Sequence, residues 1–408
     1  MRLPRPSLLC ALPVALALVG PAAARSPLPP LPARWPTTLQ LGAADSPGGA
    51  GALAKKAPFG FRYQYLAGGA NTGQGWSTWN PGGSFVTMYD NESWAAGEIP
   101  VFSYYQLLQS KPDVSGGEQA ADLAHLDDPA TMSAYWQDLR LFFERAHGAK
   151  TVVLHVEPDL WGYIEQRSKG DDASTVPAVV PDGLPQNAAG FAQELVRLRN
   201  ELAPNVLLAY HLSGWGTSHD IVYEKPPDST VRAYAARSAA FYRSLHASFD
   251  VSFEDFSDRD AGFYAKQEGN PKTWFKPADF ARHLLYAKTF VALAGVRMVA
   301  WQIPLGNTVM RADDNTWDHF QDNRVQWLLG PGSRARLRAY VAAGFVGFLF
   351  GRGADGATCA CDAAKDGVTN PPPIDGNTRA SFSADDDGGY FAAQARAYYT
   401  AGALPLGT

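Results

Sequence analysis

The sequence predicts one α/β domain built as a parallel (β/α) barrel of the TIM type. From Phe59 onward, short apolar or β-branched runs alternate with longer segments of helical spacing, which is typical of a parallel sheet covered by helices. None of these runs ends in the glycine-rich turn of a dinucleotide-binding sheet, which disfavours an open, doubly wound fold. The length of 408 residues suits one barrel with inserted loops.

Seven strands are expected, separated by segments with the period of an amphipathic helix. The expected strands are 61–66, 100–105, 151–156, 206–211, 250–255, 296–302 and 344–350. The expected helices are 131–147, 188–202, 230–246, 277–294, 334–342 and 390–399. Two alternatives close the barrel: an eighth strand in the glycine-rich stretch after Gly69, which makes a (β/α)8 barrel, or a distorted seven-stranded variant.

The N-terminus has the three parts of a secretory signal peptide: a basic start, an apolar run over 8–20 and small residues at 22–24. The expected segments are a signal peptide at 1–24, a Pro-, Gly- and Ala-rich linker or arm at 25–58, and a catalytic barrel at 59–408. The apolar run is short for a membrane span, and no later stretch is long enough. We therefore expect a secreted or periplasmic protein without membrane contact after processing.

Charge and cysteine content exclude several classes of protein. The formal net charge of −5 leaves no basic footprint for nucleic acid. Beyond the signal peptide only Cys359 and Cys361 remain, so neither a disulfide framework nor a cysteine-based zinc site is expected, and we expect no cofactor. The chain has 11 Trp, 17 Tyr and 21 Phe, which fill a core or serve as flat platforms for sugar rings.

Polar side chains gather where three consecutive expected strands end. Alternation along a strand places His155 and Glu157 on one face, which we expect to point to the barrel axis. The same count places His211 and Glu254 inside on the next two strands. The residues that fall inward on the first and sixth strands are Gln64 and Gln302. Barrel enzymes carry their chemistry at these strand ends, so we expect an active site; the alternative is a polar plug that fills the barrel.

Two carboxyl groups suffice for glycoside hydrolysis when one is protonated and the other ionised. Glu157 is the candidate acid, because it ends a largely apolar run and burial raises the pKa of a carboxyl group. Glu254, two strands further on, is the candidate partner. Asp159 and Asp255 follow these candidates where alternation no longer holds, and both complicate the assignment.

A sugar-binding cleft is expected around these carboxylates. Tryptophan rings stack on the C–H face of a pyranose and can donate a hydrogen bond from the indole nitrogen. The tryptophans expected to line the cleft are Trp76, Trp79, Trp161, Trp215 and Trp301. The other expected substrate-binding residues are Gln64, His155, His211, Asp255 and Gln302.

The segment from Val156 to Leu160, Val-Glu-Pro-Asp-Leu, resembles the Glu-Pro-Asp-Ser-Leu motif of glycoside hydrolase family 6 cellulases. The next strand, with His211 before Gly-Trp, looks like the following strand of that family. The resemblance implies a distorted seven-stranded barrel, a catalytic role for Asp159 and a sugar-stacking role for Trp215. The same strand end is also similar to the Asn-Glu-Pro strand end of the large clan of retaining barrels, which would make Glu157 the acid/base.

We therefore expect a secreted glycoside hydrolase that cleaves a polysaccharide, with Glu157, Glu254 and Asp159 as its candidate catalytic carboxylates. Two other functions stay open. A metal-dependent hydrolase would use His155, His211 and one or two carboxylates as ligands. A non-catalytic barrel would bind carbohydrate through its tryptophans alone.

Overall fold

The strands of the barrel follow one another in sequence order. The computed structural model describes residues 28–257, 259–308, 320–351, 367 and 389–407. Its strands are β1 Gln40–Ala44, β2 Phe61–Leu66, β3 Ile99–Tyr104, β4 Val152–Val156, β5 Val206–Leu212, β6 Val251–Asp255, β7 Met298–Pro304 and β8 Phe345–Gly351. The expected signal peptide at 1–24 and both Cys359 and Cys361 lie outside the described residues.

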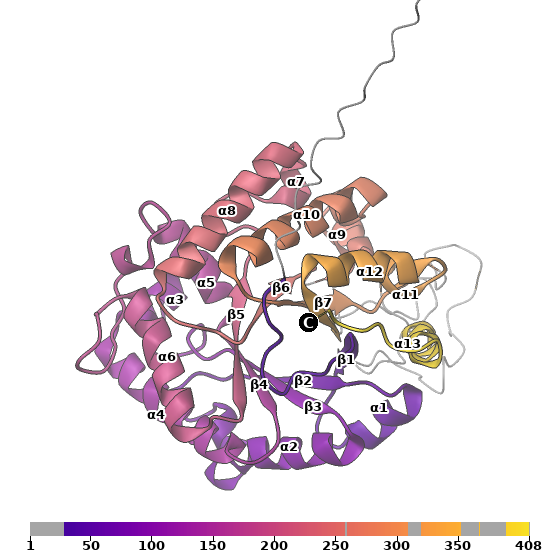
Figure 1. Ribbon diagram of the computed structural model, residues 1–408. Helices are drawn as coiled ribbons and strands as arrows, with labels where there is room; N and C mark the ends of the chain where they lie inside the picture. Colours follow the sequence, from indigo (N-terminus) through magenta and orange to yellow (C-terminus); the bar gives the residue numbers. More distant parts are fainter. Residues whose placement is uncertain (1–27, 258, 309–319, 352–366, 368–388, 408) are drawn as a thin grey trace, which may run out of the picture.

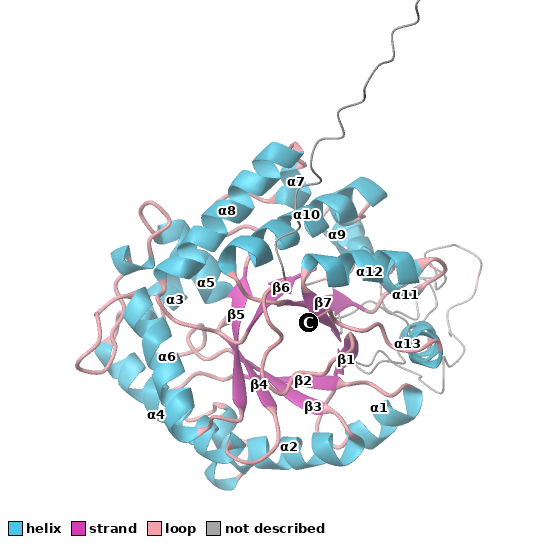
Figure 2. Ribbon diagram, in the orientation of Figure 1, coloured by secondary structure: helices cyan, strands magenta, loops and turns pink. Residues whose placement is uncertain are grey.

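The sheet is a closed barrel of eight parallel strands, surrounded by helices (Figures 1 and 2). Each strand is hydrogen-bonded to the next and β8 returns to β1, so the sheet has no free edge. The expected (β/α)8 barrel is confirmed, and the seven-stranded alternative is wrong. Closure depends on Gly42, because a Cβ at this position would lie 2.6 Å from both Phe61 and Leu349.

The eighth strand is not after Gly69, as the sequence suggested, but at Gln40–Ala44. This strand and helix α1, Ala50–Lys56, lie within the segment that was expected to be a linker or arm. The sequence Gln-Leu-Gly-Ala-Ala contains no β-branched or aromatic residue, so it lacks the local signal of a strand. Its pairing with β2 and β8 decides its conformation.

Helices cover the outside of the barrel. After α1 they are α2 Ser84–Ala96, α3 Glu118–Leu126, α4 Pro129–Ala146, α5 Pro158–Arg167, α6 Ala188–Leu202, α7 Ile221–Glu224, α8 Asp228–Ser244, α9 Ala261–Gln267, α10 Pro277–Ala294, α11 Arg324–Leu329, α12 Ser333–Ala343 and α13 Tyr390–Thr400. The six that the sequence predicted are α4, α6, α8, α10, α12 and α13. Four short 3-10 turns, at Trp76–Thr78, Pro81–Gly83, Ala173–Thr175 and Pro271–Thr273, complete the connections. Within the described ranges, no helix is both long and apolar enough to cross a membrane.

The two terminal segments cover the N-terminal end of the barrel. Arg297, which precedes β7, donates to the carbonyl oxygens of Pro29 and Gly407, and the N–H of Leu39 donates to Leu404 at 2.7 Å. In Figure 1 the C-terminus accordingly lies over the ring of strands. The opposite end, where the strands finish, is left for a site.

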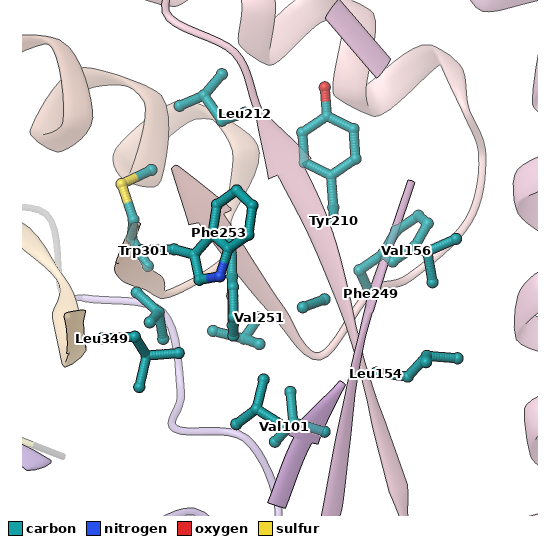
Figure 3. Packing of buried hydrophobic residues seen from close by; sticks show 14 of the residues in the cluster. Val101, Leu154, Val156, Tyr210, Leu212, Phe249, Val251, Phe253, Trp301 and Leu349 are labelled. Carbon is teal, nitrogen blue, oxygen red and sulfur yellow. The ribbon is translucent and has the colours of Figure 1, made fainter. Parts of the chain in front are cut away.

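The core has two layers that the strands separate. Val251 and Phe253 of β6 face the barrel interior, where Figure 3 shows them close to Val101 and Trp301. Tyr210 of β5 faces outward and packs on Phe290 of α10, with 6.4 Å between ring centroids. Alternation along β6 is therefore the reverse of the expected one: Phe253 occupies an inward place, and Ser252 and Glu254 point to the helices.

Candidate active site

A cavity of about 980 Å³ opens at the C-terminal end of the barrel, and residues at or just after the end of every strand line it. The lining includes Ala44 of β1, Tyr65 of β2, Tyr105 after β3, Asp159 after β4, Trp215 after β5, Asp255 of β6, Trp301 of β7 and Gly351 of β8. This is the end at which (β/α)8 enzymes place their reacting groups. The cavity contains both carboxyl groups and aromatic rings.

Asp159, the second residue of α5, forms a partly buried carboxyl pair with Glu118, the first residue of α3. The hydroxyl of Tyr105 donates to Glu118 and lies 3.3 Å from Oδ2 of Asp159. Burial, followed by the nearby Asp255 carboxylate, raises the pKa of Asp159, and burial also raises the pKa of Glu118. Two carboxyl groups this close resist ionising together, so the pair retains a proton above the usual carboxyl range.

Asp255, at the end of β6, ends a chain of hydrogen bonds that runs through the barrel interior. Its Oδ2 lies 3.2 Å from Nε2 of His211, whose Nδ1 lies 3.0 Å from Nε2 of His155. Nδ1 of His155 in turn lies 3.3 Å from the Ser103 hydroxyl. Burial lowers the pKa of His155. Burial also acts to lower the pKa of His211, but the surrounding carboxyl groups, Asp255 first among them, together raise it. His211 is therefore the ring of this chain that can hold a proton next to Asp255.

Glu157 lies outside the cavity, although alternation predicted that it would point to the barrel axis. Its φ of 43° is left-handed, so the strand ends before it and its side chain turns away. The carboxyl accepts backbone hydrogen bonds from Gln106 at 3.0 Å and Leu107 at 3.5 Å. Burial raises the pKa of Glu157 to about 8, which agrees with the protonated state expected for it. Glu157 nevertheless does not line the cavity.

Glu254 points to the outside of the barrel, and Asp255 takes the inward place expected for it. The Oε2 atom of Glu254 lies 2.8 Å from Nε2 of His283 on α10. Glu254 still contributes to the cavity wall, on the side of β6 that faces α10. The carboxyl groups that the barrel brings together at its mouth are thus Asp159, Asp255 and Glu118.

The five candidate tryptophans divide between core and cavity. Trp76 and Trp161 are fully buried, and each donates from Nε1 to a buried acceptor, so the expectation that they line a cleft is wrong. Trp79, Trp215 and Trp301 do line the cavity. Trp79 is 44% exposed, which leaves a ring face for a ligand.

Both candidate glutamines belong to the cavity wall. Gln302 has a left-handed φ of 53°, and its amide donates to the hydroxyl of Tyr65. Gln64 alternates with Tyr63 and Tyr65, whose rings lie 6.3 and 5.9 Å from that of Trp301. The tyrosines therefore take the inward places on β2, and the expectation that Gln64 points to the barrel axis is wrong. The sequence analysis missed these tyrosines, although the aromatic alternation along β2 is a signal for them.

Tyr105 and Glu118 were also missed as site residues. Tyr105 follows β3 directly, where a polar side chain at a strand end is a signal for the cavity. Glu118 follows the loop after β3 and begins α3, and nothing in the local sequence connects it to Asp159.

The two barrel histidines are engaged with protein partners. His155 contacts Ser103 and His211, and His211 contacts Asp255, so their ring nitrogens do not converge on a common point. No group of three His, Cys, Asp or Glu side chains in the described part of the chain is arranged to hold a metal ion. The ligands expected for a metal-dependent hydrolase therefore form a hydrogen-bonded relay in this barrel.

Comparisons with known proteins find structural similarity only. No protein-family profile and no curated protein sequence matches the chain. The structure is similar to a modular endo-β-1,4-mannanase of glycoside hydrolase family 26 from Cellulomonas fimi, with 12% identity and a TM-score of 0.45 over 89% of this chain and 70% of that one. It is also similar to the catalytic domain of Cel6B from Cellulomonas fimi, with 13% identity and a TM-score of 0.42 over 88% of this chain and 95% of that one. These matches come from glycoside hydrolases of more than one family, and they fix no family for this chain.

Proposed function

We propose that the protein is a glycoside hydrolase that cleaves a polysaccharide, with Asp159 as general acid and Asp255 as the ionised partner. The observation that carries this proposal is the presence of two carboxyl groups in one cavity, each with a different neighbour. Asp159 adjoins another carboxyl group, and Asp255 adjoins a histidine whose pKa is raised. Cleavage of a glycosidic bond needs this division of roles.

Each residue around the pair has a part in the reaction. Asp159 donates its proton to the leaving glycosidic oxygen, while Glu118 and Tyr105 hold the Asp159 carboxyl in place. Asp255 supplies the negative charge for the oxocarbenium-like transition state, as nucleophile or as base toward water. His211 fixes the orientation of the Asp255 carboxylate through the contact between Nε2 and Oδ2.

The aromatic wall fits an oligosaccharide segment of the substrate. Trp79, Trp215 and Trp301 follow different strands and line one cavity. Its volume of about 980 Å³ lies at the upper end of ordinary ligand pockets. Rings at separate places along such a cavity bind successive sugar units of a polymer.

The test is release of reducing ends from a panel of neutral, acidic and amino-sugar polysaccharides. The wild-type protein is expected to cut at least one of them, and Asp159→Asn and Asp255→Asn are expected to bind that glycan without cutting it. Binding without cleavage by the wild type would favour the non-catalytic alternative. Cleavage that a chelator abolishes and zinc restores would favour the metal-dependent alternative.

We also propose that the protein is exported, on the signal-peptide pattern of residues 1–24. N-terminal sequencing of the protein recovered from the periplasm or medium is expected to begin at Arg25. Recovery of an unprocessed chain from the cytoplasm alone would contradict export and leave the proposed hydrolase activity unaffected.

A further inference from the structure

The cavity extends past β6 to the side that faces α10. Asp255 and Glu254 point to opposite sides of β6, yet both line the cavity. The part on the α10 side, here called the β6 side pocket, is lined by Glu254, Thr273, His283, Tyr286 and Arg324. Sugar bound between Asp159 and Asp255 would therefore lie next to this pocket.

Polar atoms in the β6 side pocket lack hydrogen-bond partners. The side chain of Glu254 is 7% exposed, and its Oε1 has no partner, whereas Oε2 accepts from His283. The Nδ1 atom of His283 is also unpaired. The buried hydroxyl of Thr273 has no partner either. Buried polar atoms are costly to leave unpaired, so these three indicate the place of a ligand group.

Glu254 is the acidic side chain of the side pocket. Arg324 lies on the same wall, but Asp322 pairs with it at 2.6 Å, and both side chains are buried. The Nε atom of Arg324 is unpaired and can donate to a hydroxyl. The ligand that satisfies Glu254 should therefore carry hydrogen-bond donors and positive charge.

We propose that the β6 side pocket binds the ammonium group of an amino sugar in the substrate. An ammonium group supplies hydrogen-bond donors and one positive charge, which suit the unpaired Oε1 of Glu254. A hydroxyl on the same sugar carbon supplies one donor and no charge. This inference rests on the proposed function for its carbohydrate ligand, and it makes Glu254 a specificity-determining residue.

The test compares two ligands that differ only at the position in question. A β-1,4-linked glucosamine oligosaccharide and a cello-oligosaccharide of equal length differ by an amino or a hydroxyl group on each C2. Binding is measured by calorimetry in an Asp159→Asn background, to prevent cleavage, at about pH 6, where such amines are protonated. The glucosamine oligosaccharide is expected to bind at least about tenfold more tightly, as for a hydrogen bond to a charged group.

Adding Glu254→Gln should remove most of this preference, because it removes the charge and keeps the shape. Asp90→Asn in α2 is the matched control: Asp90 is a buried carboxyl with both oxygens unpaired, but it lies outside the cavity lining, so the preference should survive. Thr273→Val is a second test that leaves the charge of Glu254 in place. It should weaken glucosamine binding severalfold and leave cello-oligosaccharide binding unchanged.

Equal affinity for the two ligands, or a preference that survives Glu254→Gln, would overturn the inference. So would an equal effect of Thr273→Val on both ligands. Cleavage of neutral glycans without an amino-sugar preference would leave the hydrolase proposal standing. Tight, Glu254-dependent binding of glucosamine oligosaccharide by a wild-type protein that cuts no glycan would support the amino-sugar inference and contradict the hydrolase proposal.

Discussion

Two groups of buried carboxylates in this barrel differ in the cation that accompanies them. Arg62 of β2 lies 2.7 Å from Asp45, 3.3 Å from Glu92 and 3.9 Å from Glu98, and its guanidinium lies over the ring of Tyr89. We call these residues the Arg62 cluster. Asp159, Glu118 and Asp255, the mouth cluster, instead contact a tyrosine hydroxyl and a histidine.

The comparison teaches that a shifted pKa alone does not identify the active site. Burial raises the pKa of Asp45 to about 6 and that of Glu98 to about 8, although Arg62 opposes both shifts. What distinguishes the mouth cluster is that all three of its carboxyl groups line the large cavity. The carboxyl groups of the mouth cluster contact side chains that can hold or pass a proton, whereas those of the Arg62 cluster contact a permanent cation.

The comparison predicts its largest effect at Asp159. Asp159→Asn removes the transferable proton, so the hydrolysis rate should fall about a hundredfold to ten-thousandfold. The folded structure should persist, because the amide relieves repulsion with Glu118. Initial rates and thermal unfolding measured together check both statements. Glu157→Gln, which changes a buried carboxyl two residues earlier, is the matched control and should keep near wild-type activity; comparable activity losses would show that Glu157 is catalytic after all.

Arg62 should affect stability and not chemistry. Arg62→Met leaves the carboxyl groups of Asp45, Glu92 and Glu98 without their guanidinium, which should lower the free energy of unfolding by about 3 to 5 kcal/mol. Urea unfolding at neutral pH measures this loss, and Arg62→Met combined with Asp45→Asn should recover part of it, because Asp45 is the 2.7 Å partner of Arg62 and its pKa of about 6 lies below neutral pH. The rate per folded molecule should change little. A loss below about 1 kcal/mol, the range of exposed ion pairs, would mean that the Arg62 cluster is not a structural unit.

The pH dependence of stability gives a third test, because Glu157 keeps a proton that the unfolded chain releases. Its pKa rises from 4.5 to about 8 on burial, so stability should fall as pH rises through this interval and level off above it. Each such proton contributes about 1.4 kcal/mol per pH unit. Glu157→Gln should therefore make the decline between about pH 5 and pH 8 less steep. Parallel unfolding curves for both proteins across this interval would contradict the burial of a protonated Glu157.

Much of the barrel could be predicted because its strands are locally encoded. The apolar, β-branched run around Val153 predicted β4 within one residue of its observed start. β1 could not be found in this way, because Leu41 is its one large apolar residue. Its extended conformation is determined by pairing with β2 and β8.

The site could be predicted only as far as alternation holds. It placed His155 and His211 correctly, because both lie within regular strands. Alternation failed at Glu157, where the backbone turns left-handed. It also failed on β6, where Phe253 faces the barrel axis and Glu254 faces outward to pair with His283 of α10. Glu118 approaches Asp159 only through the tertiary fold, so no local pattern could reveal the pair.

The smallest expected effect concerns the aromatic wall around the mouth cluster. Trp79 is 44% exposed, and the ring of Phe85 supports it edge-on at 5.0 Å between centroids. Trp79→Ala should raise KM about threefold to tenfold, since an aromatic contact contributes about 0.5 to 1.5 kcal/mol. Met88→Ala, an equally exposed apolar residue outside the cavity lining, should leave KM unchanged.

Trp79 follows β2, whereas Asp159 follows β4 and Asp255 ends β6, so the ring of Trp79 should bind a sugar unit away from the bond being cut. Such a contact is equally strong in the ground state and the transition state, which lowers KM without raising kcat. A fall in kcat at unchanged KM would therefore move the cleaved bond toward Trp79. The catalytic groups would then have to include residues on the β2 side of the cavity.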